Sequence, residues 1–587
     1  MNVSSFLNQN VNKYPLNQAI GFKKVDQWQF INWKQLRTLV FKTANALREA
    51  GVEENDRVAI YSDNSAEWIT FDLAIMALGA VTVPIYSTNN KEQTEYILQD
   101  SQSKMILVGN QEQYNAVFEI IQEKDFLKQI IVSKKAVWIK QDRTIYFEDF
   151  IKSGAEEFEV VEKSSEDLAT LIYTSGTTGV PKGVMITHGN FISAFQAHYD
   201  FFNFENPERE HSLAFLPLTH VFERSWTLLA LTMGTKVSIL ENPKLIANTL
   251  VEVKPTMMCT VPRFYQKIFN GINDLINNGS PMKKKIFNWA LEVGGEVAVL
   301  RRAGKDVPFG LKTKFGVANT MVFNKIKAKL GGKLWFSPVG GASIDENIVK
   351  FFDAMGLHMT IGYGMTETTA TVTCYPMLNY EYKSAGVRIG DAEIKIGEND
   401  EILVKGSGVM KGYYQLPEEN AKVFTEDGWL RTGDAGYISD TGSLVITDRI
   451  KDLMKTSNGK YIAPQPIENI LGNNNLINNV MLIAEGRPFV TALIVPNFEL
   501  LEVRLKELNL LSGTQADWVT KPEVKEMYTQ IIGEMQKNLP GYEKVKKFTL
   551  LPADLEVHAG EITPTLKIKR NILSEKYKTI IEEMYQH

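Results

Sequence analysis

Residues 173–184 read YTSGTTGVPKGV and continue a short apolar run, LATLIY, at 168–173. The run predicts a buried strand that ends at a turn. The turn supplies glycines, which let the backbone approach a ligand closely, together with hydroxyl donors and the charge of Lys182. These groups suit an oligophosphate. The Walker template does not fit, because Lys182 stands between a proline and a glycine. A plain polar turn between two strands is the alternative.

The length and composition predict a large globular protein. A chain of 587 residues exceeds one ordinary core, so two or more domains are expected. The net charge of −5 gives no electrostatic case for nucleic acid or an anionic membrane as the main partner. Cys259 and Cys374 lie far apart, as is typical of core residues in a reducing compartment. With no signal-peptide pattern and no window of ~20 apolar residues, we expect a cytoplasmic location.

The order of patterns along the chain predicts the fold class. Apolar runs alternate with helical patterns, for example RVAIYS (57–62) and WITFDLAIMAL (68–78), which favours βαβ units and largely parallel sheets. Residues 271–333 are helix-prone and basic, and residues 386–447 read as short strands and turns. We therefore expect an α/β N-terminal domain over 1–447 with a helical insertion and a β-rich submodule. A joint at 448–452 and a small, mobile α+β domain over 453–587 complete the prediction.

A second motif, GYGMTETTA at 362–370, suits a nucleotide that carries Mg²⁺. Glu367 is a hard oxygen ligand of the kind that Mg²⁺ uses together with substrate phosphates, although a lone Glu in such a turn is more often a solvated residue or a cap. The two motifs together resemble those of the adenylate-forming ligases, which include acyl-CoA synthetases, luciferases and nonribosomal adenylation domains. The resemblance implies that Tyr363 packs on adenine, that Thr366 contacts the α-phosphate, and that Glu367 and Thr174 hold Mg²⁺.

Four further motifs extend the resemblance. Asp434 in GWLRTGD (428–434) would anchor the ribose, because a carboxylate can accept both hydroxyls, and Arg449 of DRIKD would add a ribose or phosphate contact. Gly341 and Ala342 in SPVGGASI (337–344) would lie between the adenine and the acyl pocket. His220 in PLTHVFER (217–224) would gate that pocket. Each motif also has a plain structural alternative: a turn, a cap or a satisfied core histidine.

The C-terminal motifs resemble those of a moving domain. Lys567 in EITPTLKIKR (561–570) stands where the superfamily has its catalytic lysine, although Thr-Leu replaces the usual Ser-Gly before it. This departure is typical of the long-chain branch, and a surface strand with alternating basic residues is the alternative. Asn458 and Gly459 stand where the family usually has two glycines, and would line the pantetheine channel after rotation about a hinge near Lys451.

Six motifs in family order over about 175–570 most resemble those of long-chain fatty-acid–CoA ligases. The resemblance implies ATP, Mg²⁺ and coenzyme A as cofactors and a fatty acid as substrate, with acyl-AMP and pyrophosphate formed before acyl transfer to coenzyme A. An acyl-AMP ligase serving a carrier protein, a ligase for another carboxylic acid, a phosphotransferase and a nucleotide sensor are the alternatives. Chain length, a homodimer and peripheral contact with the inner face of the membrane stay open. The expected catalytic residues are Lys567, Glu367, Thr366 and His220, and the expected cofactor-binding residues are Thr174, Ser175, Gly176, Thr177, Thr178, Gly179, Lys182, Gly341, Ala342, Gly362, Tyr363, Asp434, Arg449, Asn458 and Gly459.

Overall fold

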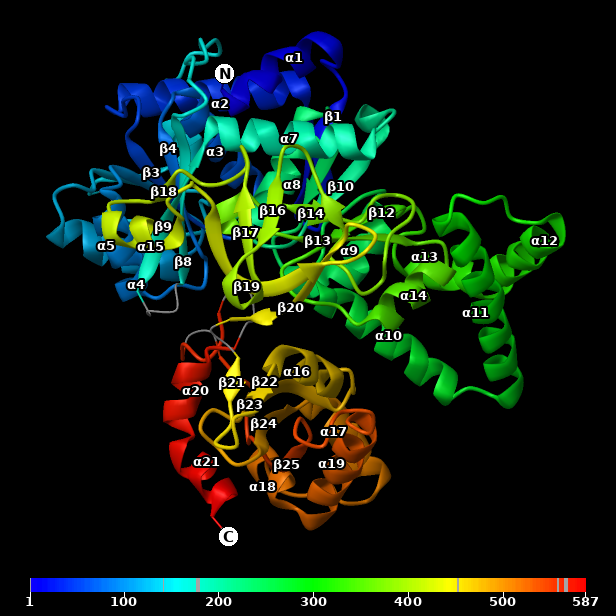
Figure 1. Ribbon diagram of the computed structural model, residues 1–587. Coiled ribbons are helices and arrows are strands. Elements are labelled where there is room, and N and C mark those ends of the chain that lie inside the picture. The colour runs from blue at the N-terminus through cyan, green and yellow to red at the C-terminus, as the bar shows by residue number, and fades with distance from the viewer. Residues whose placement is uncertain are drawn as a thin grey trace.

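The computed structural model describes residues 2–140, 142–175, 180–450, 453–556, 559–563 and 568–586. A large N-terminal domain lies above a small C-terminal domain, and a group of helices projects from the side of the large domain (Figure 1). The small domain has a hydrophobic core of its own, built from residues between Ile462 and Met584. The fold is mixed α/β, in agreement with the predicted class.

An eight-stranded sheet forms the first half of the large domain. Its strands are parallel from β8 to β7, and β9 and β18 add an antiparallel edge beside β8. The alternation predicted from RVAIYS and WITFDLAIMAL is found here as β3, α3 and β4. In spatial order the strands are β18 (Gly412–Tyr413), β9 (Pro181–Thr187), β8 (Leu168–Ser175), β4 (Val81–Ile85), β3 (Arg57–Tyr61), β5 (Met105–Val108), β6 (Gln129–Val132) and β7 (Thr144–Tyr146). The helices of this half are α2 (Trp33–Glu49), α3 (Ala66–Ala77), α4 (Lys91–Ser101), α5 (Gln111–Glu123), α6 (Phe147–Phe150) and α7 (His188–Phe202).

Two four-stranded sheets form the second half. Residues 256–261 lie between the two sheets and make only isolated bridges. Met257 bridges Ser212 and Phe336, and this short contact joins the two sheets. The sheets are β10 (His211–Ala214), β11 (Lys236–Ile239), β1 (Gln18–Lys24) and β2 (Gln27–Asn32), and β12 (Phe336–Val339), β13 (His358–Tyr363), β14 (Thr373–Cys374) and β15 (Val387–Arg388). Their helices are α1 (Phe6–Lys13), α8 (Val221–Thr232), α9 (Ile246–Val253) and α14 (Glu346–Ala354).

A third sheet is antiparallel and lies nearest the C-terminal domain (Figure 1). Its strands in spatial order are β16 (Glu393–Ile396), β17 (Glu401–Lys405), β19 (Leu430–Ile438) and β20 (Leu444–Arg449). The segment between β17 and β19 leaves this sheet, and β18 pairs with β9 of the eight-stranded sheet instead. The helix α15 (Pro417–Val423) follows β18, so this segment lies beside the hairpin that carries the first motif.

The projecting helices form an arm over residues 262–333 (Figure 1). A close approach to α14 anchors it, since a Cβ at Gly294 would lie 2.2 Å from the carbonyl oxygen of Ala354, and only glycine fits there. In the part of the chain that the structure describes, no helix has the length and apolar character needed to span a bilayer. The arm comprises α10 (Pro262–Asn277), α11 (Pro281–Arg302), α12 (Phe309–Ala318), a π-helical turn (Asn319–Phe323) and α13 (Asn324–Lys329).

The C-terminal domain packs helices around a three-stranded sheet. Its central strand, VTALIVP, is buried along its whole length, which explains its unbroken apolar run. The three-stranded sheet consists of β23 (Ile477–Ile483), β24 (Val490–Pro496) and β25 (Val545–Leu550). A separate two-stranded sheet consists of β21 (Met454–Lys455) and β22 (Tyr461–Ile462). The helices are α16 (Pro464–Gly472), α17 (Phe498–Glu507), α18 (Gln515–Thr520), α19 (Pro522–Met535), α20 (Arg570–Lys576) and α21 (Lys578–Tyr585).

Polar side chains join the two domains where α16 and the asparagine-rich loop after it meet the large domain. The Nδ2 of Asn473 donates to Oδ2 of Asp345 at 2.9 Å. The Nε2 of Gln266 donates to Oδ1 of Asn473 at 2.7 Å and to the carbonyl oxygen of Gly472 at 2.9 Å. We call this set the interdomain polar contact, and its other pairs are Asn469 with Ser343, Asn475 with Asp274, and Arg263 with Asn478.

Candidate active site

The first motif forms the end of the β8–β9 hairpin. Thr174 faces Lys182 across the two strands, and the backbone of Ser175 pairs with Pro181. The predicted phosphate-binding residues Gly176, Thr177, Thr178 and Gly179 lie outside the described residues. The hairpin therefore brings the flanking residues of the predicted phosphate loop to one edge of the eight-stranded sheet.

Lys182 is tethered near the loop end of this hairpin. Its Nζ forms an ion pair with Glu419 of α15 and lies 5.2 Å from the ring centroid of Tyr413. Hydrogen bonds from Lys182 and Lys422 hold the pKa of Glu419 at about 2. These contacts fix the β18–α15 segment to the hairpin. Glu419 and Tyr413 were not predicted from the sequence, since nothing in their own pattern points to a lysine more than two hundred residues away.

Glu367 lies in a buried 3₁₀ turn, Thr366–Thr368, which follows β13 and packs against β9. The hydroxyl of Tyr413 donates to Oε1 of Glu367 at 2.9 Å. Burial raises the pKa of Glu367, and the Tyr413 hydrogen bond opposes the rise. Thr366 is also buried in this turn. A cation beside this buried carboxylate would stabilise its ionised form.

The donor set fits Mg²⁺ that arrives with phosphates. The carboxylate of Glu367 and the hydroxyl of Thr174 are hard oxygen donors, and both belong to elements that meet at β9. Among the described residues there is no cluster of three or more His, Cys, Asp or Glu side chains that could hold a metal by itself. Mg²⁺ commonly binds through one or two carboxylates plus substrate phosphates, so a sparse protein set is what this ion uses.

The predicted adenine and ribose residues are brought into direct contact. The hydroxyl of Tyr363 donates to Oδ2 of Asp434 at 2.7 Å, and Nε of Arg449 lies 3.3 Å from Oδ1. Asp434 and Arg449 are opposite each other on β19 and β20, which explains the pairing. Tyr363 and Asp434 are buried, whereas Arg449 is half exposed. A ribose hydroxyl could therefore replace Arg449 at Oδ1 without disturbing Tyr363.

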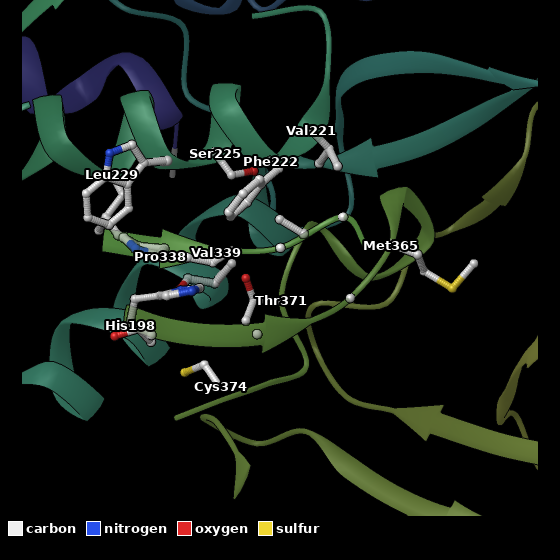
Figure 2. Close-up of a pocket in the computed structure, with 18 of the residues that line it drawn as sticks. His198, Val221, Phe222, Ser225, Leu229, Pro338, Val339, Met365, Thr371 and Cys374 are labelled. Atoms are coloured by element: carbon white, nitrogen blue, oxygen red, sulfur yellow. The ribbon is translucent and has the colours of Figure 1, made fainter. Parts of the chain in front are cut away.

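An apolar pocket lies between α7, α8 and the strands β12 and β13 (Figure 2). The side chains of Val221, Phe222, Ser225 and Leu229 reach from α8 toward Pro338 and Val339. Glycines line one end, and they are Gly340, Gly341, Gly362 and Gly364.

Two predicted residues at this pocket have defined local roles. Gly341 has φ +84°, a left-handed conformation that favours glycine, and the exposed Ala342 follows it. His220 caps the N-terminus of α8, where its Nδ1 accepts from the backbone N–H of Phe222 at 3.2 Å, and it also lines the pocket. His220 therefore lies at the predicted pocket and also has the structural role of a helix cap.

Two charged residues of PLTHVFER form a buried support that was not predicted. Arg224, with 1% of its side chain exposed, bonds both oxygens of Asp72 at 2.6 and 2.9 Å and donates to Oγ1 of Thr170 on β8 at 2.7 Å. Glu223 accepts from the N–H of Leu216 at 2.9 Å, and burial raises its pKa to about 8. The two charged residues interrupt an otherwise apolar helix pattern, and this pattern could have indicated a buried ion pair.

The C-terminal predictions fall partly outside the described residues. Lys451 and Lys567 are not described. Asn458 and Gly459 form the turn between β21 and β22, with φ +76° at Gly459. The Nδ2 of Asn458 donates to the carbonyl oxygen of Pro488 at 3.2 Å. In this domain orientation, the turn contacts its own domain.

Comparison with known proteins agrees with this arrangement. A long-chain-fatty-acid–CoA ligase of Mycobacterium bovis, FadD15, is 30% identical over 560 residues, which are 95% of this chain and 92% of the relative. The human long-chain-fatty-acid–CoA ligase ACSBG2 is 27% identical over 621 residues, which are 100% of this chain and 92% of the relative.

Solved structures share the fold. The anthranilate CoA ligase AuaEII, in complex with anthranoyl-AMP, has a TM-score of 0.75 at 19% identity and covers 99% of this chain and 98% of its own. The adenylation domain of a carboxylate reductase from Mycobacterium chelonae has a TM-score of 0.77 at 18% identity, covering 100% and 91%. At these identities the likeness shows the fold alone.

The buried Glu367, the Tyr363–Asp434 pair and the apolar pocket fit an enzyme that binds a nucleotide and an apolar substrate. Residues 7–414 match the AMP-binding enzyme family, and residues 451–587 match the AMP-binding enzyme C-terminal domain. The chain belongs to the AMP-binding enzyme family. The predicted resemblance to adenylate-forming ligases and the predicted fold class are confirmed.

Proposed function

We propose that this protein is a long-chain fatty-acid–CoA ligase. It attacks ATP with the carboxylate of a fatty acid to form acyl-AMP with release of pyrophosphate, and then transfers the acyl group to the thiol of coenzyme A with release of AMP. The observation that carries the proposal is the position of the apolar pocket. Gly362 and Gly364 line it, and between them stands Tyr363, which holds Asp434. A bound acid with an apolar tail would have its carboxylate beside the nucleotide. The names of the relatives from Mycobacterium bovis and human support this substrate class.

The first half-reaction brings a carboxylate to the α-phosphorus of ATP, so an anion must approach a polyanion. Glu367 and Thr174 would hold Mg²⁺, which when bound offsets phosphate charge. The pocket positions the acid, Tyr363 and Asp434 position the nucleoside, and Lys567 would add a positive charge at the reacting oxygens. Lys182 keeps the hairpin against Glu419.

The second half-reaction requires a different partner at the same site. In this orientation the Asn458–Gly459 turn contacts Pro488 of its own domain, and the interdomain polar contact holds α16 against α10. Rotation near Lys451 would break that contact, withdraw Lys567 and bring the turn toward the pocket. One site can then serve two reactions in sequence.

The test is AMP release with a panel of carboxylic acids that differ in chain length, with and without coenzyme A. The proposal expects AMP release with long-chain acids that depends on coenzyme A, and pyrophosphate release in a stoichiometric burst without it. Release of ADP or a phosphorylated product would overturn the reaction class. Turnover that needs a carrier protein in place of coenzyme A would favour the acyl-AMP ligase alternative.

The role of Lys567 is tested separately. We expect Lys567→Ala to slow adenylation by at least ~10²–10³, the loss typical of one charge-stabilising donor. Transfer from preformed acyl-AMP to coenzyme A should largely survive. Pyrophosphate exchange at the wild-type rate would show that another residue supplies the charge. Cell fractionation tests the proposed cytoplasmic location.

A further inference from the structure

The net charge of the whole chain hides a strong local asymmetry. The helical arm, residues 262–333, contains fourteen Lys and Arg against four Asp and Glu, a net formal charge of +10. The whole chain has −5, so the remaining residues carry −15. An asymmetry of this size indicates a partner with negative charge that meets the arm alone.

The arm stands where a large surface could reach it. The turn between α10 and α11, the helix α11 and the helix α12 form the outer edge of the molecule, away from its sheets (Figure 1). The C-terminal domain is hydrogen-bonded to α10 of the arm, at Arg263, Gln266 and Asp274. The outer edge therefore stays accessible in this domain orientation.

Four basic residues of the arm have internal contacts: Arg263 and Lys327 donate hydrogen bonds, and Arg301 and Arg302 lie over aromatic rings. Within residues 262–333, all of which the structure describes, no Lys or Arg forms a salt bridge. Lys283, Lys284 and Lys285 stand at the N-terminal end of α11, which has no acidic residue in its first turn. Positive charge is unfavourable at that end of a helix. These lysines work against the stability of their own helix, which is typical of residues retained for binding.

Large apolar side chains are exposed on the same edge. Phe309 at the start of α12 is 86% exposed, Met282 at the start of α11 is 68% exposed, and Leu275 near the end of α10 is 64% exposed. Lysines lie close in sequence to each of the first two, at Lys305 and Lys312 around Phe309 and at Lys283 after Met282. The remaining exposed apolar residues of the arm are Val299, Val317 and Met321.

We propose that the outer edge of the helical arm is a docking surface for an anionic phospholipid bilayer. Lysines would meet the headgroups, and Phe309, Met282 and Leu275 would enter the boundary between headgroups and acyl chains. A nucleic acid is a less suitable partner. Basic and polar side chains contact its phosphates, whereas the exposed apolar side chains of the arm would have no partner there. The proposal does not depend on the proposed catalytic function.

The test is co-sedimentation of the full chain with vesicles of phosphatidylcholine, with or without phosphatidylglycerol, at low and at physiological salt. The arm variant is Lys283→Glu/Lys285→Glu/Lys312→Glu. The control, Lys24→Glu/Lys525→Glu/Lys546→Glu, changes the net charge equally at exposed lysines elsewhere. A third variant, Phe309→Ser, tests the apolar part. All are checked by circular dichroism, and none touches the candidate active site.

Each lysine at an anionic surface strengthens binding roughly five-fold, so we expect the arm variant to lose at least about 100-fold in affinity for the anionic vesicles. Phe309→Ser should lose about ten-fold, since part of an aromatic ring no longer leaves water. The control should bind like the wild type, and pure phosphatidylcholine should bind all proteins weakly. Failure of the wild type to bind anionic vesicles, or equal losses in arm and control variants, would overturn the proposal. Tight binding to duplex DNA without vesicle binding would also overturn it.

Discussion

The interdomain polar contact gives a quantitative prediction. Gln266→Ala/Asn473→Ala removes three hydrogen bonds, namely those of Asn473 with Asp345, Gln266 with Asn473 and Gln266 with Gly472, at 2.9, 2.7 and 2.9 Å. Each is worth about 0.5–1.5 kcal/mol net, so together they contribute about 1.5–4.5 kcal/mol to this domain orientation. The variant should depopulate the orientation at least ten-fold relative to its competitors.

The rates of the two half-reactions should respond differently to the loss of this domain orientation. We propose that this orientation is the one that precedes acyl transfer in the cycle. We expect the double variant to lose at least ten-fold in ATP–pyrophosphate exchange, while transfer from preformed acyl-AMP is not slowed. Asn115→Ala/Gln530→Ala, which truncates the same residue types at exposed positions elsewhere, is the control. Equal losses in both half-reactions, or no loss, would refute the reasoning.

An engineered disulfide across the interdomain polar contact should hold the two domains in this orientation. The Nδ2 of Asn469 and the Oγ of Ser343 are 2.5 Å apart across the interface. The natural cysteines, Cys259 and Cys374, are both buried, so an engineered pair can be oxidised selectively. Oxidised Ser343→Cys/Asn469→Cys should keep pyrophosphate exchange and lose acyl transfer, with recovery after reduction. Acyl transfer at the wild-type rate in the oxidised protein would show that the contact need not open.

Three further predictions concern buried groups of the N-terminal domain. Arg224→Met leaves the carboxylate of Asp72 buried without its counter-charge, so we expect a loss of about 3–5 kcal/mol in urea unfolding, and a loss under about 1 kcal/mol would contradict this. Glu223, with a pKa of about 8, is protonated in the folded state at pH 7 and ionised after unfolding, so its contribution to stability falls as pH rises from about 4.5 to 8. Glu223→Gln should reduce that slope, by at most about 1.4 kcal/mol per pH unit, and an unchanged slope would count against it. Tyr413→Phe removes a hydrogen bond that favours ionised Glu367, so the pKa of Glu367 should rise and the acidic limb of the adenylation pH profile should move to higher pH. An unchanged acidic limb would show that the ionisation of Glu367 does not cause it.

Local patterns carried most of the correct predictions. The run LATLIY became β8 because an apolar stretch ending in glycines and hydroxyls can be a buried strand and a turn and little else. Asp434 and Arg449 could be assigned to one site by resemblance, and their opposition on adjacent strands shows why they lie together. Each of these features depends on residues close in sequence or on a motif of fixed spacing.

Features that depend on distant partners could not be read in this way. Nothing around Gly412 and Tyr413 indicates that β18 leaves its neighbours to pair with β9. The charged residues of PLTHVFER carried a signal, but Asp72, the partner of Arg224, lies 152 residues away. The basic character of residues 271–333 could be read from the sequence. The net charge of the whole chain, −5, gave no indication that this segment could bind an anionic surface.

The pairing of β18 with β9 also sets an order of events during synthesis. Val184 finds its partner Tyr413 only after another 229 residues have been made. At about 5–20 residues per second, β9 presents an unpaired edge for roughly 10–50 s on the nascent chain. An open strand edge is a template for pairing with other chains, so this interval is when the emerging protein most needs shielding. The nucleotide site is also completed late, although its delays are shorter: Glu367 waits 46 residues for Tyr413, and Tyr363 waits 71 residues for Asp434.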